Sequence, residues 1–250
     1  MSIFSNIFGG GAGKKHINDF ADVGVDMHSH MIPGIDDGAK TMEDSLKMLR
    51  AMQNLGYKKI ITSPHVMGDF YRNTTEIILS GLENVRHAAK EAKIDIEIDA
   101  IAEYYLDENF LELIKKRDLL TFGKNYLLFE MSYVNKYSNL QGAIFEMKLA
   151  GYKPVLAHPE RYSFMYEDFK EYEQLYDFEV YFQLNLGSFA GHYGPKAKEI
   201  AYKLIKNKMV DFIGSDAHHM RHVGLYPKIQ EDKVLKGLID SGLLRNAKLL

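Results

Sequence analysis

The chain has 250 residues, of which 46% are hydrophobic and 26% charged, so it carries enough apolar side chains for a folded core and is neither disordered nor collagen-like. It contains no cysteine, which excludes disulfide frameworks, thiolate zinc sites, iron–sulfur clusters and cysteine nucleophiles. The formal net charge of −3 provides no cationic surface for nucleic acid, and no stretch approaches the roughly 20 apolar residues of a membrane span. We therefore expect a globular protein that binds no nucleic acid and does not insert into a membrane.

The first 18 residues form a Gly-rich segment, which we interpret as a flexible arm ahead of a single domain over residues 19–250. The segment has neither a basic leader nor a long apolar core, so we expect no secretion and a cytoplasmic location. Phe4, Ile7 and Phe8 offer an alternative, in which the arm is a short apolar anchor on the domain or on a partner.

From Val23 onward, short β-branched runs alternate with helical patterns, and Gly, Pro, Asp and Asn separate them. The predicted strands are Val23–Ser29, Lys59–Ser63, Ile94–Ala102, Tyr126–Met131, Pro154–Ala157, Val180–Asn185 and Val210–Ser215. The helices predicted to follow them are Met42–Leu55, Thr74–Lys93, Glu108–Lys116, Leu140–Gly151, Asp168–Leu175, Pro195–Lys208 and Pro227–Ser241. Thr41 with Asp44 resembles a capping box, and Gly56 and Gly151 stand where helices should end.

This alternation predicts parallel strands joined by right-handed crossovers, hence either an open doubly wound sheet or a closed barrel. A barrel collects functional residues at the carboxyl ends of many strands, whereas an open sheet concentrates them at one switch point. Polar residues follow nearly every predicted strand here. The sequence therefore favours an α/β fold of the TIM-like barrel type, distorted and built from seven βα units.

The polar residues at the strand ends are imidazoles and carboxylates. In Asp26-Met27-His28-Ser29-His30, the two imidazoles are two residues apart, so the strand pleat points both to one face, where they can share one ion. The alternative for this pair is two buried histidines that only form hydrogen bonds. The turn at Asp37 and the ends of the other strands add similar groups, and the complete candidate set is His28, His30, Asp37, His65, Glu103, Glu130, His158, Asp216 and His218.

Nine candidate ligands exceed the capacity of one ion, because a transition metal takes about four to six ligands including waters. We therefore expect a cluster of two or three divalent ions that share carboxylate bridges. Imidazole and carboxylate ligands suit Mn²⁺, Fe²⁺ or Zn²⁺, and the residues alone do not choose among them. His16, His87 and His192 fall in the arm, on a helix and in a loop, where solvated or capping roles are expected, and His219 and His222 are left unassigned.

These motifs resemble the polymerase-and-histidinol-phosphatase (PHP) superfamily through His28-Ser29-His30, Ser63-Pro64-His65, Ala157-His158 and Ser215-Asp216-Ala217-His218. Within it, Ile35-Asp36-Asp37-Gly38, Ala102-Glu103-Tyr104-Tyr105 and Ala157-His158-Pro159-Glu160-Arg161-Tyr162 resemble the bacterial capsule-associated protein-tyrosine phosphatases of the CpsB/CapC type, over about Asp26 to Pro227. The resemblance implies a distorted barrel of seven βα units with a trinuclear centre often assigned to manganese. It also implies a substrate, the tyrosine autokinases that control exopolysaccharide export.

The same resemblance assigns metal binding to the candidate set, with Glu103 as a bridge and Glu130 as a ninth member, and phosphate binding to Arg161, a role that fits the guanidinium fork. The alternative for Arg161 is an ordinary ion pair with Glu160 or with another neighbour. Arg221 is offered as a second phosphate ligand, although its spacing departs from the family pattern.

Three further interpretations stay open from the sequence. A small-molecule phosphatase, for example one acting on histidinol phosphate, would use the same ions in a narrower pocket. A metal-loaded regulatory module would keep the ligands without turnover. The aromatic segments around Tyr71 and Tyr193 either flank an aromatic phosphoester or form ordinary loop packing, which we rank first.

Overall fold

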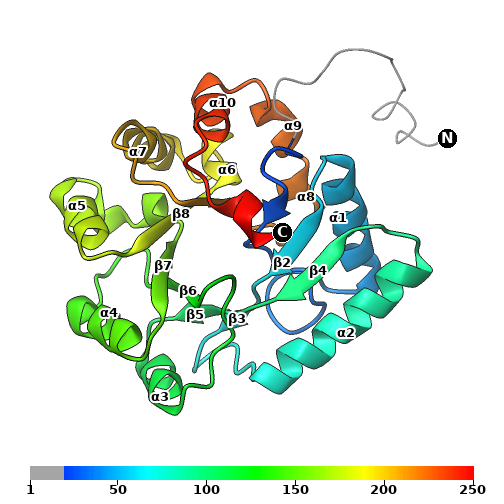
Figure 1. Ribbon diagram of the computed structural model, residues 1–250, viewed down its shortest axis with the longest axis horizontal. Coiled ribbons are helices and arrows are strands. Elements are labelled where there is room, and N and C mark those ends of the chain that lie inside the picture. The colour runs from blue at the N-terminus through cyan, green and yellow to red at the C-terminus, as the bar shows by residue number, and fades with distance from the viewer. Residues whose placement is uncertain (1–19) are drawn as a thin grey trace.

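The computed structural model describes residues 20–250, and the predicted arm over residues 1–18, with His16, lies outside them. In the described residues, parallel strands curl around a centre and helices cover their outer side (Figure 1). No helix in this part of the chain is long and apolar enough to cross a membrane.

The strands of the described residues form two sheets in which every pair is parallel. The smaller sheet has the order β1 (Val25–Asp26), β2 (Lys59–Thr62) and β4 (Glu97–Ala100). The larger sheet has the order β3 (His65–Val66), β5 (Glu103–Tyr105), β6 (Tyr126–Glu130), β7 (Lys153–Ala157), β8 (Tyr181–Asn185) and β9 (Phe212–Gly214).

Two predicted strands are interrupted. The strand predicted over Lys59–Ser63 ends at Thr62, and the chain resumes as β3 after Pro64, which has no N–H to donate to a ladder. The strand predicted over Ile94–Ala102 becomes β4, and β5 follows after a short break. Because β3 and β5 pair in the larger sheet, these two segments join the two sheets covalently.

The first and last strands meet beyond their named ends. β1 covers two residues where seven were predicted, but the backbone continues beside the segment after β9. Asp216 N donates to His28 O at 2.7 Å, and His30 N donates to Ala217 O at 3.0 Å. The two sheets therefore form a curled parallel arrangement like a half-barrel, and the count of seven units stays a prediction.

The helices lie where the sequence pattern predicts them, with one main exception. They are α1 (Met42–Asn54), α2 (Thr75–Glu91), α3 (Glu108–Lys116), α4 (Leu140–Leu149), α5 (Lys170–Asp177), α6 (Leu186–Phe189), α7 (Pro195–Lys206), α8 (Met220–Val223), α9 (Tyr226–Ile229) and α10 (Lys233–Asp240). Within residues 20–250 there are also 3₁₀ turns at Pro159–Arg161, Ser163–Met165 and Asn246–Leu249.

The helix ends follow from capping chemistry. The capping box of Thr41 and Asp44 at the start of α1 is confirmed, and Gly56, with φ of 97°, follows its end. The single helix predicted over Pro227–Ser241 is wrong, because Asp232 accepts hydrogen bonds from Val234 N and Leu235 N and starts α10 as a separate helix.

The interior of the curled sheets holds a small apolar cluster that consists mainly of strand residues, including Val25, Ile61, Leu128, Val155 and Phe212. A larger core packs the strands against the helices. Side chains two residues apart on a strand share a face, so residues further along the same strands point into the same interior. Polar groups at the carboxyl ends of the strands therefore lie next to this apolar cluster.

Candidate metal centre

All nine candidate ligands predicted from the sequence come together at the carboxyl ends of the strands. Four groups place their ligand atoms within 4.8 Å of one another: His30, Asp37, His65 and His218; His28, His30 and Asp216; His28, Glu103 and His158; and His65, Glu103 and Glu130. His28, His30, His65 and Glu103 each belong to two groups, so the groups form one continuous cluster. Whether these side chains bind metal stays a prediction at this point.

Glu103, fully buried at the start of β5, is the centre of the cluster. Its Oε2 lies 3.2 Å from His28 Nε2 and 3.2 Å from His65 Nδ1, and its Oε1 lies 2.9 Å from His158 Nε2. His28 Nε2 also lies 3.4 Å from Asp216 Oδ1. This arrangement suits a carboxylate that bridges two ions.

A chain of side-chain amides fixes which nitrogen of His28 carries the proton. Asn185 Nδ2 donates to Asp216 Oδ2 at 2.6 Å, and Gln183 Nε2 donates to Asn185 Oδ1 at 2.9 Å. Gln183 Oε1 then faces His28 Nδ1 at 2.7 Å. Because a carboxylate only accepts, each amide can face only one way, and His28 Nδ1 must donate. The lone pair of His28 Nε2 therefore points into the cluster.

His30 is oriented in the same sense by Asp36. Its Nδ1 donates to Asp36 Oδ2 at 2.8 Å, which leaves the lone pair of Nε2 pointing at the cluster. His30 Nε2 and His28 Nε2 then face each other at 3.4 Å. Two lone pairs at this distance, beside buried carboxylates, repel unless a cation or a proton lies between them.

An imidazole nitrogen of the cluster is buried without a hydrogen-bond partner, which favours a bound cation beside it. His65 Nδ1 lies 3.1 Å from Glu130 Oε1, yet within the described residues it has no partner in hydrogen-bond geometry. A buried nitrogen without a partner is costly, and binding a metal removes that cost. Together with the opposed lone pairs and the set of imidazole and carboxylate donors, this fits divalent transition-metal ions.

The carboxylates of the cluster are held in their ionised form. Burial alone would raise the pKa of Glu103, but in the metal-free protein the positive charges of protonated His28 and His65 hold it well below its ordinary value. Burial also opposes ionisation of Asp216, and the charges of His28 and His218 outweigh it, so its pKa is again well below the ordinary value. Both groups are therefore ready to bind cations.

A cavity of about 730 Å³ opens onto this cluster. His65, Glu103, Glu130, His158 and Asp216 line it, as do Asp37 and His218. Aromatic side chains form part of its wall: Tyr71, Tyr105, Tyr133 and Tyr193. The cluster is therefore accessible to a ligand from outside.

Arg161, in the 3₁₀ turn after β7, also lines this cavity. Its Nη1 donates to Asp216 Oδ2 at 3.0 Å, so its ion pair is with the cluster and not with Glu160. Glu160 instead accepts hydrogen bonds from Ser188 Oγ and Asn185 N, and burial raises its pKa to about 7.

Arg221 lies apart from these groups. It is exposed on α8 and is not among the residues that line the cavity, so the structure does not bring it to the cluster. His192, expected to be solvated or capping, does line the cavity, together with His219 and His222. His87 is exposed on α2, as expected, beside Glu91.

Several residues that position the ligands were not predicted. Gln183 and Asn185 are fully buried on β8, where the run Tyr181-Phe182-Gln183-Leu184-Asn185 alternates polar and apolar residues. That alternation, in a strand buried on both faces, is a signal that would have found them. Asp36 was quoted only within the motif of its turn and given no role, although it is buried and bonded to His30.

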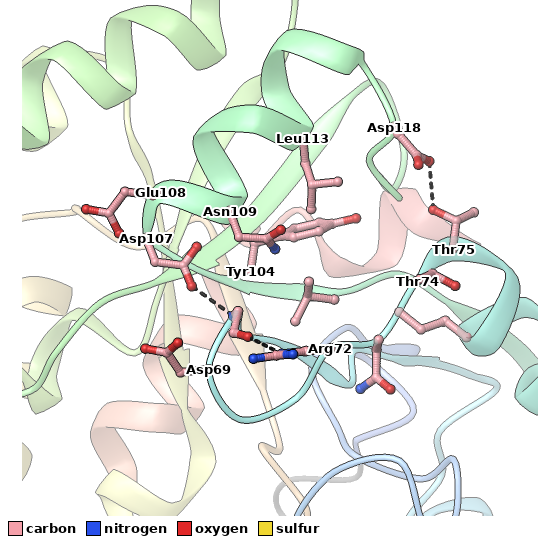
Figure 2. Close-up of a pocket in the computed structure, with 14 residues that line it drawn as sticks. Asp69, Arg72, Thr74, Thr75, Tyr104, Asp107, Glu108, Asn109, Leu113 and Asp118 are labelled. Carbon is pink, nitrogen blue, oxygen red and sulfur yellow. Dashed lines mark hydrogen bonds between the residues drawn. The ribbon is translucent and has the colours of Figure 1, made fainter.

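A second cavity, of about 470 Å³, lies beside the loop between β3 and α2 (Figure 2). Gly68 N donates to Asp107 Oδ2 there, Arg72 Nε donates to Gly68 O, and Thr75 Oγ1 donates to Asp118 Oδ1 (Figure 2). None of the nine candidate ligands is among the described residues that line this cavity.

The chain is similar to two bacterial tyrosine-protein phosphatases. Tyrosine-protein phosphatase YwqE of Bacillus subtilis is 27% identical over 198 residues, which cover 79% of this chain and 78% of the relative. Tyrosine-protein phosphatase CpsB of Streptococcus pneumoniae is 28% identical over 202 residues, which cover 78% of this chain and 83% of the relative.

Solved structures agree in the fold. One solved structure comes from work on YwqE of Bacillus subtilis and CpsB of Streptococcus pneumoniae, which are described as unique metal-dependent tyrosine phosphatases. It matches this chain with a TM-score of 0.80 and 26% identity, and the match covers 90% of each chain. An amidohydrolase from Mycoplasma synoviae, at 13% identity and a TM-score of 0.51, shares only the fold and covers 93% of this chain and 86% of its own. The family model for capsular polysaccharide synthesis proteins of the CpsB/CapC type matches residues 24–235, and the chain therefore belongs to the CpsB/CapC family.

Proposed function

We propose that this chain is a metal-dependent phosphatase that hydrolyses phosphotyrosine on proteins. The observation that carries the proposal is the continuous cluster of imidazoles and carboxylates beside Arg161 in an open cavity. The names of the relatives, which are metal-dependent tyrosine phosphatases, support the same reaction.

The nine clustered side chains are proposed as the ligands of two or three ions, with Mn²⁺ as the first choice and Fe²⁺ or Zn²⁺ as alternatives. Four of these side chains are carboxylates, and Arg161 is the guanidinium that pairs with one of them. Nine ligands exceed the capacity of one ion, because a transition metal takes about four to six ligands including waters. This number of ligands supports at least two ions.

Divalent ions held by these residues would supply charge neutralisation for the phosphoryl oxygens and a nucleophilic water near neutral pH. The chain's own residues supply orientation. Gln183 and Asp36 hold the imidazoles of His28 and His30 with their Nε2 lone pairs toward the cluster. Arg161 presents N–H donors at the cavity wall, where they stabilise negative charge on the phosphoryl oxygens during in-line displacement.

The finer identity of the substrate is also proposed. The family resemblance favours a bacterial tyrosine autokinase that controls capsule or exopolysaccharide synthesis, and such a partner places the enzyme in the cytoplasm. The cavity is open to the surface and has tyrosines in its wall, which suits an aromatic phosphoester carried by a protein segment. A second phosphate contact from Arg221 would need a movement of α8.

We further propose that residues 19–250 form one domain of the PHP type, a distorted barrel of seven βα units. The hydrogen bonds that join residues 28–30 to residues 216–217 support closure between the first and last units.

The test compares substrates on the purified protein loaded with Mn²⁺. Hydrolysis of a phosphotyrosyl peptide is expected to exceed that of histidinol phosphate by a wide margin, and chelation is expected to abolish both. The His158→Ala variant should lose hydrolysis while its circular dichroism stays unchanged. Faster turnover of histidinol phosphate would reject the protein-phosphatase assignment, and no hydrolysis by the loaded wild-type protein would favour a regulatory module.

A further inference from the structure

The guanidinium group of Arg161 lies between two aromatic rings. Its Cζ is 4.3 Å from the ring centroid of Tyr133 and 4.2 Å from that of Tyr193. Tyr133 follows β6, and Tyr193 precedes α7, so the two rings come from separate parts of the chain. Both distances are well within the range of a cation–π contact.

The hydroxyl groups of the same tyrosines bond to the metal cluster. Tyr133 Oη donates to Glu130 Oε2 at 3.3 Å, and Tyr193 Oη donates to Asp216 Oδ2 at 3.2 Å. Each ring is therefore anchored at its tip by a candidate ligand while its face packs against Arg161. The position of the guanidinium is thereby linked to the position of the ligands.

The two ring contacts leave N–H groups of the guanidinium free for hydrogen bonding. Among the described residues, Nη1 has a partner in Asp216 Oδ2, whereas no hydrogen bond engages Nε or Nη2. The side chain is 20% exposed and borders the cavity. These N–H donors are therefore free to meet an anion above the cluster, and the two rings hold the plane in which they point.

We propose that Tyr133 and Tyr193 are positioning residues, which together clamp Arg161 so that its free N–H groups face the substrate phosphate. This inference rests on the proposed phosphatase function and adds two residues that the sequence motifs do not include. The rings act by stacking, and each hydroxyl sets the ring against the cluster. A lysine at position 161 has no planar group for two rings to hold.

The test measures inorganic phosphate binding to the Mn²⁺-loaded protein by titration calorimetry, together with kcat and KM for a phosphotyrosyl peptide. Tyr133→Leu and Tyr193→Leu are each expected to weaken phosphate binding and to raise KM about tenfold, the factor that a partly desolvated cation–π contact supplies. Tyr133→Phe and Tyr193→Phe keep the stack and should restore phosphate affinity to within about threefold of wild type. In an Arg161→Lys background, the Leu substitutions should have little further effect, because coupled residues are not additive.

Tyr181→Leu is the matched control. Tyr181 packs against Arg245, with 5.0 Å from the guanidinium to the ring centroid, and neither residue lines the cavity. This variant should lower the midpoint of urea unfolding and leave phosphate affinity unchanged.

Leu variants that bind phosphate as wild type does would overturn the clamp, as would Phe variants as weak as the Leu variants. Calorimetry separates this result from failure of the proposed function: if the wild-type protein binds phosphate but hydrolyses no phosphotyrosyl peptide, the substrate assignment fails while the clamp is still tested.

Discussion

Replacing Gln183 by Leu tests how the protein prepares His28 to bind a metal. In the wild-type protein, the Gln183 carbonyl accepts the Nδ1 proton of His28 at 2.7 Å, and both side chains are fully buried. Without metal, the Gln183→Leu protein can avoid an unpaired donor on His28, because the proton can move to Nε2, where Glu103 Oε2 lies 3.2 Å away as an acceptor. With metal on Nε2, the proton must stay on Nδ1, where it has no partner.

The penalty therefore falls mainly on the metal-bound state. A buried donor left without a partner costs about 1–3 kcal/mol, which corresponds to a loss of metal affinity of about 10- to 100-fold. The metal-free protein loses the buried hydrogen bonds of Gln183 to His28 and to Asn185, so its urea midpoint should also fall, separately from the loss of metal affinity in the folded protein.

Competition with a chromogenic chelator gives the metal affinity, and urea unfolding of the metal-free protein gives the stability. Asn246→Leu is the control, because Asn246 is as fully buried and bonds the backbone of Val25 and Ile213 without touching the cluster. It should lower stability and leave the metal affinity of the folded protein unchanged. A Gln183→Leu protein with metal affinity within twofold of wild type would refute the proton assignment.

Three more predictions follow from the same structure. Removing metal with EDTA should lower the thermal midpoint, because ions that bind only the folded state stabilise it, and an unchanged midpoint after verified metal loss would contradict the cluster. Gly38→Ala should weaken metal binding at least about tenfold, because a Cβ at this position would lie 2.3 Å from His30 O. Gly237→Ala is the control, since its Cβ would have open space around it and should leave metal affinity unchanged. Equal metal affinities of the two variants would contradict the prediction. Burial raises the pKa of Asp211 above its ordinary value of 3.8, despite the ion pair with Arg245. The folded protein therefore holds the carboxyl proton more tightly than the unfolded chain does. The stability that this proton contributes is lost as the pH rises above 3.8. The difference in unfolding free energy between wild type and Asp211→Asn should therefore fall from pH 4 upward in urea titrations, and a difference that rises would reverse the sign.

The sequence predicts the members of the cluster because one rule covers all of them except Asp37, which lies in a turn. Parallel strands place their carboxyl ends at the same edge, so a polar residue just past each apolar run belongs to one site wherever it occurs in the chain. His28 and Asp216 are 188 positions apart and still lie within 3.4 Å through this rule. No knowledge of loop structure is needed for such a prediction.

The rule fails where a turn or a break decides the outcome. Asp36 and Asp37 are neighbours with the same chemistry, and only the turn shows that Asp36 bonds His30 Nδ1 while Asp37 approaches His65 and His218. The break at Pro64 is of the same kind, because it transfers the chain from one sheet to the other and starts β3 at His65.

Asp216 shows why the sequence predicts which residues form the cluster but does not predict all the contacts that each of them makes. One of its oxygens, Oδ1, lies near His28 and His30, while Oδ2 accepts hydrogen bonds from Arg161, Asn185 and Tyr193. A strand-end position gives the first of these contacts, since it depends only on which strands are adjacent. The second set depends on a turn, on the neighbouring strand β8 and on a loop, and the sequence does not show that the turn and the loop reach Asp216. The carboxylate that faces the metal ligands on one side thus also fixes the amide chain and the arginine on the other, so a change at any of these partners is expected to act on the metal site through Asp216.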